Sequence, residues 1–303
     1  MVVLILTWVN RRDLQDWWAL RDYTPTNEVV ELATDTTMTD GARRIFYVNN
    51  PVIVDEIEFN SACRPESTIV LGCFILNDGI YLFDIEDERL EGIKQVTAAH
   101  ELLHAMYERL SDEDRSRVDQ LTQQALETVT EQRIIDTVEE YKKRDANVVP
   151  NELHSILATE VRQLPEELES YYKKIFYNRQ KIVNYSEDYE LEFSARKDQV
   201  NQLDQQLAQL KLQIDASQND LALQYNALTN SKQELDSLLN AGLIEQYNNL
   251  VPGFNQQVSS YNQLVKGVDD QINQYNALVK DRNNLALEVQ ELVESIDSRP
   301  QNF

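Results

Sequence analysis

The hydrophobic pattern changes twice along the chain, which predicts three segments. Residues 1–9 (MVVLILTWV) form an apolar run that ends at Asn10-Arg11-Arg12. Residues 24–185 combine short apolar runs with longer helical patterns, whereas residues 186–303 carry apolar side chains at alternating spacings of three and four. We therefore expect an N-terminal apolar or amphipathic segment (1–23), a mixed α+β domain (24–185) and a coiled-coil helical hairpin (186–303).

The central segment begins with short β-branched and aromatic runs and continues with helical periodicity. The runs at 45–48, 52–54, 68–71 and 80–83 are bounded by turn-forming residues, which predicts strands, with 79–84 at an edge of the sheet. From about residue 88 the period becomes helical. Ser111 and Asn151 occupy the positions of N-caps for later helices. Strands followed by helices indicate an α+β fold.

The C-terminal segment has the spacing of two coiled-coil helices that are out of phase with each other. The first series includes Val200, Leu203, Leu207 and Leu210, and the second includes Val258, Tyr261, Val265 and Val268. The phase changes between residues 241 and 254, where Gly242 and Pro252-Gly253 would break a helix. We expect an antiparallel hairpin that turns near 241–254.

The N-terminal run admits two interpretations. Nine residues are too few to span a bilayer, which requires about 20. The run is therefore either a buried first element of the globular domain or the end of a truncated membrane anchor. Trp17 and Trp18, close to Arg11, Arg12 and Arg21, would suit a membrane interface.

Charge and composition narrow the classes of function. The chain of 303 residues has 28 Lys and Arg against 52 Asp and Glu, a net charge of −24. We expect no nucleic-acid partner, because phosphate binding needs clustered cations. With 7 Gly and 7 Pro, a turn-rich all-β fold is disfavoured, and 2 Cys are too few for a cysteine zinc cluster.

The sequence His100-Glu101-Leu102-Leu103-His104 has the HExxH pattern of zinc hydrolases. Residues four apart share one face of a helix, so His100 and His104 could bind one Zn²⁺ ion. Glu101 is rotated by about 100° from His100 and would lie beside the attacking water as general base. With three His in the whole chain, a chance occurrence of this pattern is improbable. We predict a zinc site with Zn²⁺ as cofactor.

A catalytic zinc site usually has three protein ligands, and the third must come from outside this motif. The stretch Asn151-Glu152-Leu153-His154 opens a later helix, and Glu160 lies two turns further on. Glu152, His154 and Glu160 are the alternatives for the third ligand. Glu152 and His154 are about 200° apart around a helix, so both cannot face one ion.

HExxH followed by a helix that begins Asn-Glu-x-x-Ser resembles the thermolysin-type gluzincins over about residues 80–165. The resemblance implies that His100, His104 and Glu152 bind zinc and that Glu101 is the catalytic base. The brace that the family has four residues after the third ligand is Ile156 here. The whole layout also resembles poorly characterised, membrane-anchored bacterial zincins with a C-terminal coiled coil.

Cys63 and Cys73 flank a proline-containing loop and a run of strand-forming residues. A disulfide between them is reasonable in an extracytoplasmic protein, whereas in the cytosol both would be buried thiols. We expect a membrane-anchored protein at the cell surface, so the disulfide and the anchor hypothesis support each other.

The sequence thus predicts a zinc metallopeptidase that hydrolyses peptide or protein substrates aligned on strand 79–84. The coiled-coil arm would position the enzyme, bind a coiled-coil partner or self-associate. The alternative is a catalytically inert, zinc-stabilised scaffold or cell-surface interaction protein that acts through the coiled coil.

Overall fold

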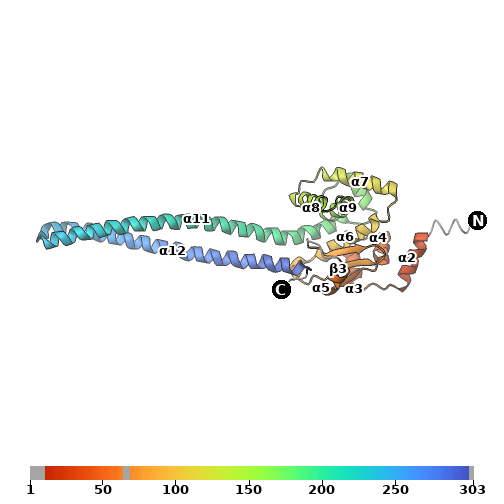
Figure 1. Cartoon of the computed structure of the whole chain (residues 1–303), viewed down its shortest axis with the longest axis horizontal. Helices are drawn as coiled ribbons and strands as arrows, with labels where there is room; N and C mark the ends of the chain where they lie inside the picture. Colours follow the sequence, from red (N-terminus) through yellow and green to blue (C-terminus); the bar gives the residue numbers. More distant parts are fainter. Residues whose placement is uncertain (1–10, 64–68, 300–303) are drawn as a thin grey trace, which may run out of the picture. The chain divides into compact units, whose positions relative to one another are not determined.

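The computed structural model describes residues 11–63 and 69–299, and these residues are mainly helical (Figure 1). Three short strands lie between residues 52 and 83, and the last part of the chain forms two long helices. In chain order the elements are α2 (Arg11–Asp22), α3 (Asn27–Asp35), α4 (Asp40–Val48), β1 (Val52–Val54), α5 (Glu56–Ala62), β2 (Gly72–Ile75), β3 (Gly79–Phe83), a 3₁₀ turn η1 (Glu88–Leu90), α6 (Ile93–Tyr107), α7 (Asp112–Leu126), α8 (Gln132–Arg144), α9 (Val149–Glu160), α10 (Glu166–Tyr172), α11 (Arg179–Asn240) and α12 (Ile244–Ile296).

The chain forms two compact units. The first contains residues 1–193 together with 291–303, and the second contains residues 194–290. The sequence-based boundary lay at 185/186 and gave the last residues to the hairpin. In the structure the end of the chain belongs to the first unit, where the buried Leu292 packs with Val54, Phe59 and Leu90.

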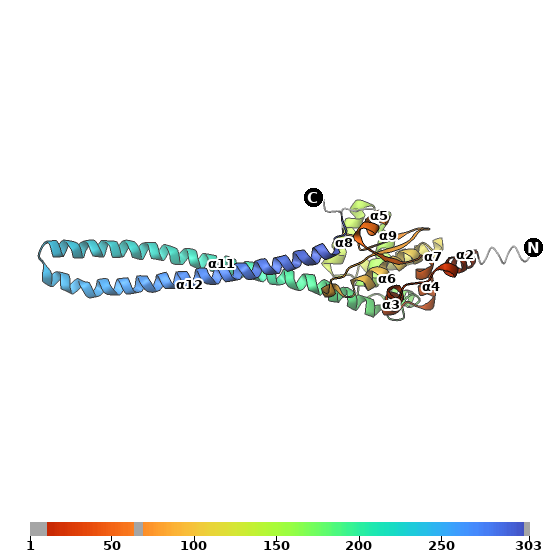
Figure 2. The same ribbon diagram turned by 90° about the horizontal axis from the view of Figure 1, so that it is seen from below.

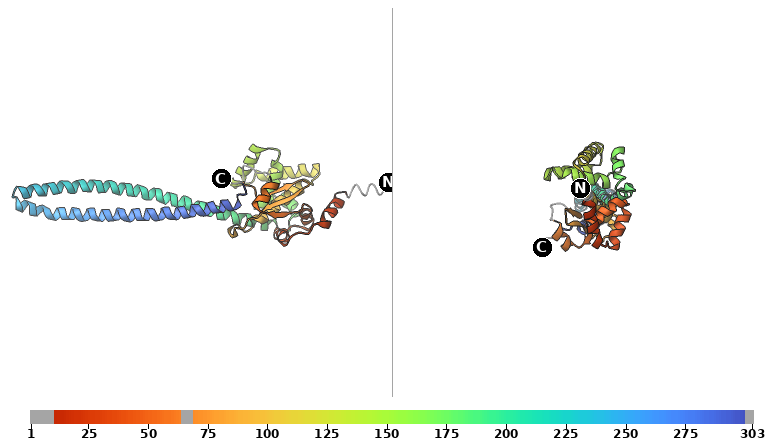
Figure 3. Two further views of the ribbon diagram at one scale, coloured as in Figure 1. Left: turned by 60° about the horizontal axis from the view of Figure 1, so that its bottom comes forward. Right: turned by 90° about the vertical axis from the view of Figure 1, so that its right-hand side faces the viewer.

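A three-stranded sheet in the order β1-β3-β2 lies within the first unit (Figure 3). β1 runs parallel to β3, and β2 runs antiparallel to it. The prediction that 79–84 is an edge strand is wrong, because β3 is bonded on both sides. Among the described strands, β2 and β1 are the edges.

Successive side chains of β3 point to opposite faces of the sheet, and each face packs into a separate apolar cluster. Ile80 and Leu82 point toward α6 and join the larger cluster, which includes Leu102 and Leu103. Phe83 points to the other face, where it packs with Phe59 of α5. Strand β3 is therefore buried on both faces and anchors α6 on one of them.

Two short runs differ from their predicted structure. Residues 45–48 are the end of helix α4, because the side chain of Thr39 caps this helix and Ala42 and Phe46, four apart, bury one face. Residues 69–71, from the predicted strand at 68–71, lie outside any strand, and β2 begins at Gly72. The strands predicted at 52–54 and 80–83 and the N-cap at Ser111 are confirmed.

Helix α9 begins earlier than the sequence indicated. Its first residue is Val149, with Val148 at the N-cap position and Pro150 in the first turn. The prediction of Asn151 as N-cap is wrong, because the Asn151 side chain bonds a histidine of α6 instead.

A buried arginine caps the other end of α9. The guanidinium of Arg179 donates to the backbone carbonyls of Ala158 and Val161 at 3.0 and 2.7 Å, and to that of Arg162 at 3.0 Å. It also pairs with Glu169, and its side chain is 3% exposed. These bonds satisfy carbonyls that the helix itself leaves open and place a cation at the negative end of the helix dipole.

In the second unit, α11 and α12 run side by side in opposite directions (Figures 1 and 2). Arg196 pairs with Glu288, Arg282 with Asp204, and the ring of Tyr225 lies 6.3 Å from that of Tyr261. In each pair the two residue numbers sum to about 485, which is the signature of one constant antiparallel register. The predicted helical hairpin is therefore present.

The hairpin turn is shorter than predicted. α11 ends at Asn240 and α12 starts at Ile244, with Gly242 in the left-handed region at φ +74. Residues 244–254 belong to α12, so the prediction of breakers at Pro252-Gly253 is wrong. Pro252 is exposed, as is Asn248 four residues before it, so water can satisfy the carbonyl that proline leaves unbonded.

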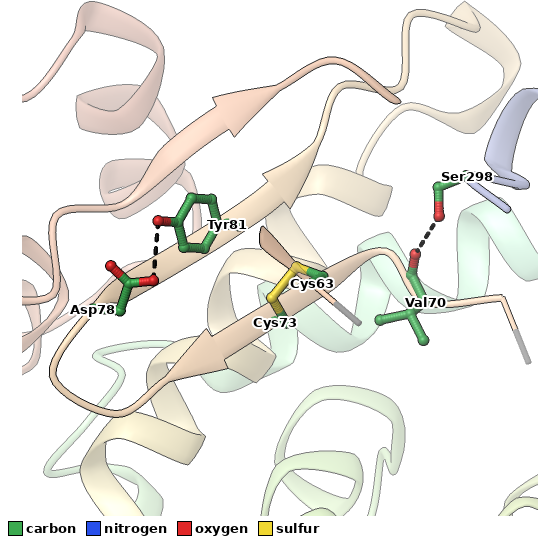
Figure 4. Close-up of a disulfide and its surroundings, with 6 residues drawn as sticks. All are labelled: Cys63, Val70, Cys73, Asp78, Tyr81 and Ser298. Atoms are coloured by element: carbon green, nitrogen blue, oxygen red, sulfur yellow. Dashed lines mark hydrogen bonds between the residues drawn. A yellow bond between two sulfur atoms is a disulfide. The ribbon is translucent and has the colours of Figure 1, made fainter. Parts of the chain in front are cut away.

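A disulfide joins Cys63, directly after α5, to Cys73 in β2 (Figure 4). Cys63 is buried in the smaller apolar cluster. Nearby, the Ser298 hydroxyl donates a hydrogen bond to the Val70 carbonyl at 3.3 Å. The backbone carbonyl of Ser298 accepts a hydrogen bond from the side chain of Asn60. The disulfide thus ties the outer strand of the sheet to α5.

Residues 1–9, where the sequence admitted a membrane anchor, lie outside the described residues. Among the helices that the structure describes, none combines the length and the apolar character needed to cross a membrane.

We predict that Arg179→Met lowers the free energy of unfolding of the first unit by about 3 kcal/mol or more. The substitution leaves buried backbone carbonyls without a hydrogen-bond donor and Glu169 without its ion-pair partner. Chemical denaturation measures this loss. The matched control is Arg162→Met, which breaks a solvated pair with Glu187 and should cost less than about 1 kcal/mol. Equal losses in the two variants would contradict the capping role.

Candidate metal centre

Helix α6 places the two histidines on one face, directed away from the apolar cluster. The rings of His100 and His104 lie 4.7 Å apart between centroids, and their side chains are 19% and 12% exposed. The rest of this helix is largely buried, including Ala98, Ala99, Leu102 and Leu103. The surrounding core therefore holds both imidazoles in place with little freedom.

Helix α9 packs against α6 and brings Glu152 to the histidines. One carboxylate oxygen lies 3.6 Å from His100 Nε2, and the other lies 3.8 Å from His104 Nε2. Two ligands about 2 Å from a tetrahedral metal ion are about 3.3 Å apart, so these separations suit three ligands around one ion. The pairs are too long for hydrogen bonds.

Glu152 also has an unpartnered buried atom. Its Oε2 is inaccessible to solvent and has no hydrogen-bond partner among the described residues. A buried carboxylate oxygen without a partner is costly, and a cation at the histidines would satisfy it. This unpartnered oxygen is an observation independent of the sequence motif, and it indicates that these residues fit a metal ion.

The electrostatic surroundings favour the ionised form of Glu152. Burial raises the pKa of its carboxyl, but the nearby imidazole of His100, the charge of His104 and the hydroxyl of Tyr141 together outweigh this effect. The net pKa lies below its ordinary value, so the carboxylate is negative and available to a cation. Tyr141 comes from α8, and no sequence motif indicated it.

Glu101 lies beside this group but in a different environment. One ligand atom from each of His100, Glu101 and His104 can be chosen so that all three lie within 4.8 Å of one another. Glu101 is 5% exposed, and burial raises the pKa of its carboxyl to about 7. The charge of His104 and the backbone N–H of Phe74 oppose this increase, whereas the charge of Glu152 adds to it. The site therefore contains two carboxyl groups with opposite pKa shifts.

Asn151 and Ser155 of α9 orient His104. The Asn151 Oδ1 lies 3.0 Å from His104 Nδ1, and the Ser155 hydroxyl lies 3.4 Å from the same nitrogen. When Nδ1–H donates to Asn151, the lone pair of Nε2 points toward Glu152 and the metal position. The sequence left this brace unassigned, although both residues belong to the Asn-Glu-x-x-Ser stretch.

His154, the second candidate for the third ligand, faces the protein core. It is fully buried, and its ring lies 5.5–5.6 Å from those of Tyr107, Tyr171 and Tyr172. Its Nε2 bonds the Tyr171 hydroxyl at 3.0 Å. Burial lowers its pKa to about 3, so it is a neutral packing residue on the far side of α9 from Glu152.

Glu160, the third candidate, is already paired. Its Oε2 lies 2.6 Å from Arg133 Nη1, which links the end of α9 to α8. Of the three candidates, Glu152 is the one whose carboxylate the structure brings to His100 and His104. The two imidazoles and nearby carboxylates could hold a divalent cation, and the geometry alone does not select zinc among such ions.

No protein-family model matches the chain, and comparisons with curated proteins and with solved structures find nothing similar. The assignment of the site therefore depends on its own geometry and on the HExxH pattern.

We predict that Asn151→Ala weakens zinc binding by about 10–100-fold, because His104 loses the partner that orients its ring. Competition with a fluorescent chelator measures the dissociation constant. Asn147→Ala, which removes an exposed side chain bonded to Asp145, should leave it unchanged. If both variants bind zinc like the wild type, the bracing role is refuted.

The third ligand can be assigned by three parallel substitutions. Glu152→Gln should weaken zinc binding by more than about a hundredfold, since losing a ligand costs more than losing an orienting partner. Glu160→Gln and His154→Phe should retain affinity in the fraction that folds. Metal content after gel filtration, measured by mass spectrometry, decides the assignment, and loss of zinc in one of the latter variants alone would transfer the role to that residue.

Proposed function

We propose that the protein is a zinc-dependent endopeptidase, related in its site to the thermolysin-type gluzincins. The observation that carries the proposal is the convergence of Glu152 on the two histidines, beside a buried Glu101 that belongs to the same helix. A structural metal site has no need of this additional carboxylate. A zincin-like fold of the first unit is part of the proposal.

Each site residue has a separate chemical role in this mechanism. His100, His104 and Glu152 would hold the ion, which when bound would polarise the scissile carbonyl and lower the pKa of the attacking water. Glu101 accepts the proton of that water and later gives it to the leaving amine. Asn151 keeps His104 in the required tautomer.

The free edge of β2 is suited to align an extended peptide substrate. In an antiparallel ladder, alternate residues direct their backbone groups away from the partner strand. Phe83 N–H donates to the Leu71 carbonyl, so in this register the backbone groups of Gly72 and the carbonyl of Phe74 point away from β3 and would face a substrate. β2, rather than the predicted strand 79–84, takes this role, and pairing with a peptide backbone would place its scissile bond near α6.

Two features support an extracytoplasmic, membrane-anchored location as part of the proposal. The disulfide between Cys63 and Cys73 is typical of oxidising compartments. Trp17 and Trp18 of α2 are each more than half exposed, as suits side chains at a membrane interface, and they follow the apolar run of residues 1–9. The coiled-coil hairpin would then position the enzyme or bind a partner.

A second candidate function is supported by the hairpin turn. Leu239, Leu243, Ile244 and Leu250 are 41–52% exposed there, and apolar exposure of this kind is typical of a binding surface. In this alternative the chain is an inert, zinc-stabilised scaffold or cell-surface interaction protein that acts through its coiled coil.

Metal content and peptidase activity of Glu101→Gln separate the two candidates. We expect about one zinc per chain in this variant and in the wild type, with hydrolysis slowed on the order of 10³-fold by loss of the base. Glu113→Gln, an exposed change in α7, is the matched control and should be fully active.

Unchanged hydrolysis in Glu101→Gln would refute the proposed mechanism. Zinc binding by the wild type without cleavage of a broad peptide library would favour the scaffold, and failure to bind zinc after reconstitution would refute the metal site itself.

A further inference from the structure

Strand β2 approaches helix α6 unusually closely at Gly72. A Cβ atom added to this glycine would lie 2.6 Å from Thr97 Cγ2 and 2.9 Å from both Cγ and Oε1 of Glu101. No ordinary side-chain carbon tolerates such separations. The absence of a side chain at position 72 is therefore what permits the strand to lie against the face of α6 that carries Glu101.

The close approach brings a backbone donor to the carboxylate of Glu101. The N–H of Phe74, two residues along β2, lies near this group and acts to lower the pKa of its carboxyl. The strand register directs this N–H away from β3, so it is not needed for the sheet. Glu101 is buried, and its carboxylate is thus oriented by a backbone group rather than by solvent.

The disulfide restrains the same strand from its other face. Cys73 lies between Gly72 and Phe74, pairs with Tyr81 of β3, and bonds Cys63 of the smaller apolar cluster (Figure 4). The strand is held by its ladder with β3 on one edge and by a covalent link to α5. It cannot readily withdraw from α6 when a larger side chain occupies position 72.

We propose that Gly72 is a positioning residue for Glu101, because it lets β2 lie close enough to α6 for the Phe74 N–H to fix the carboxylate beside the metal site. The inference depends on the proposed function, in which Glu101 acts on the attacking water. It assigns to β2 a second role, in addition to that of a substrate edge.

The test is Gly72→Ala in the full chain, with Gly41→Ala as the matched control, since a Cβ at Gly41 meets nothing within 4 Å. The added methyl must displace Glu101, Thr97 or the strand, and none of the three atoms nearest to it belongs to His100, His104 or Glu152. We expect zinc affinity within about threefold of wild type and kcat lowered about a hundredfold, as for a misplacement of about 1 Å. Gly41→Ala should change neither value.

Two double variants show whether the effect passes through Glu101. Gly72→Ala combined with Glu101→Gln should be no slower than Glu101→Gln alone, because the displaced group is already disabled. Gly72→Ala combined with Thr97→Ser removes the nearest obstructing atom and should recover part of kcat. It also provides a folded variant if the single alanine variant is unstable.

A spectroscopic measurement provides a readout that does not require turnover. In the Co²⁺-loaded chain, Gly72→Ala should shift the visible spectrum in the same direction as Glu101→Gln, while Gly41→Ala leaves it unchanged. A Gly72→Ala protein with wild-type kcat and spectrum would overturn the inference, as would additive losses in the Glu101 double variant. An inactive wild type that binds metal would refute the proposed function, and the spectrum would then decide the role of Gly72 by itself.

Discussion

The packing of α6 against α9 is the interaction on which the candidate site depends. Neither helix alone contains the whole group, since α6 supplies two imidazoles and α9 supplies the carboxylate that meets them. The contact is fixed beyond the site by a neutral, buried His154 among tyrosines on one side of α9 and by Arg179 at its C-terminus. A helix held in this way cannot rotate, and rotation would remove Glu152 from the histidines.

Burial of two carboxyl groups side by side is the electrostatic constraint that follows. The chain has a net charge of −24, so no general excess of cations offsets them. The fold treats the two groups differently. At Glu152 the nearby imidazoles and Tyr141 outweigh the effect of burial on the pKa, whereas at Glu101 burial dominates and His104 and one backbone N–H oppose it only in part. Such a division is typical of sites in which one carboxylate binds and another transfers a proton.

The sequence predicted those features that depend on local periodicity. His100 and His104 share a helix face because four residues make about one turn, and the heptads predicted two paired helices. Features that depend on tertiary contacts were missed. Residues 45–48 look like a strand yet are helical, Asn151 bonds His104 rather than capping its helix, and the roles of Tyr141 and Gly72 depend on elements distant in sequence.

Residues 105–148 connect the two halves of the site through α7 and α8, and α9 contacts both of these helices. The entropy cost of closing a connection grows only with the logarithm of its length, about 0.6 kcal/mol for each doubling. Loop closure by itself therefore constrains the number of residues between the HExxH motif and Glu152 only weakly. An interval of another length would keep the same separations between Glu152 and the two histidines, provided that α6 and α9 still pack together.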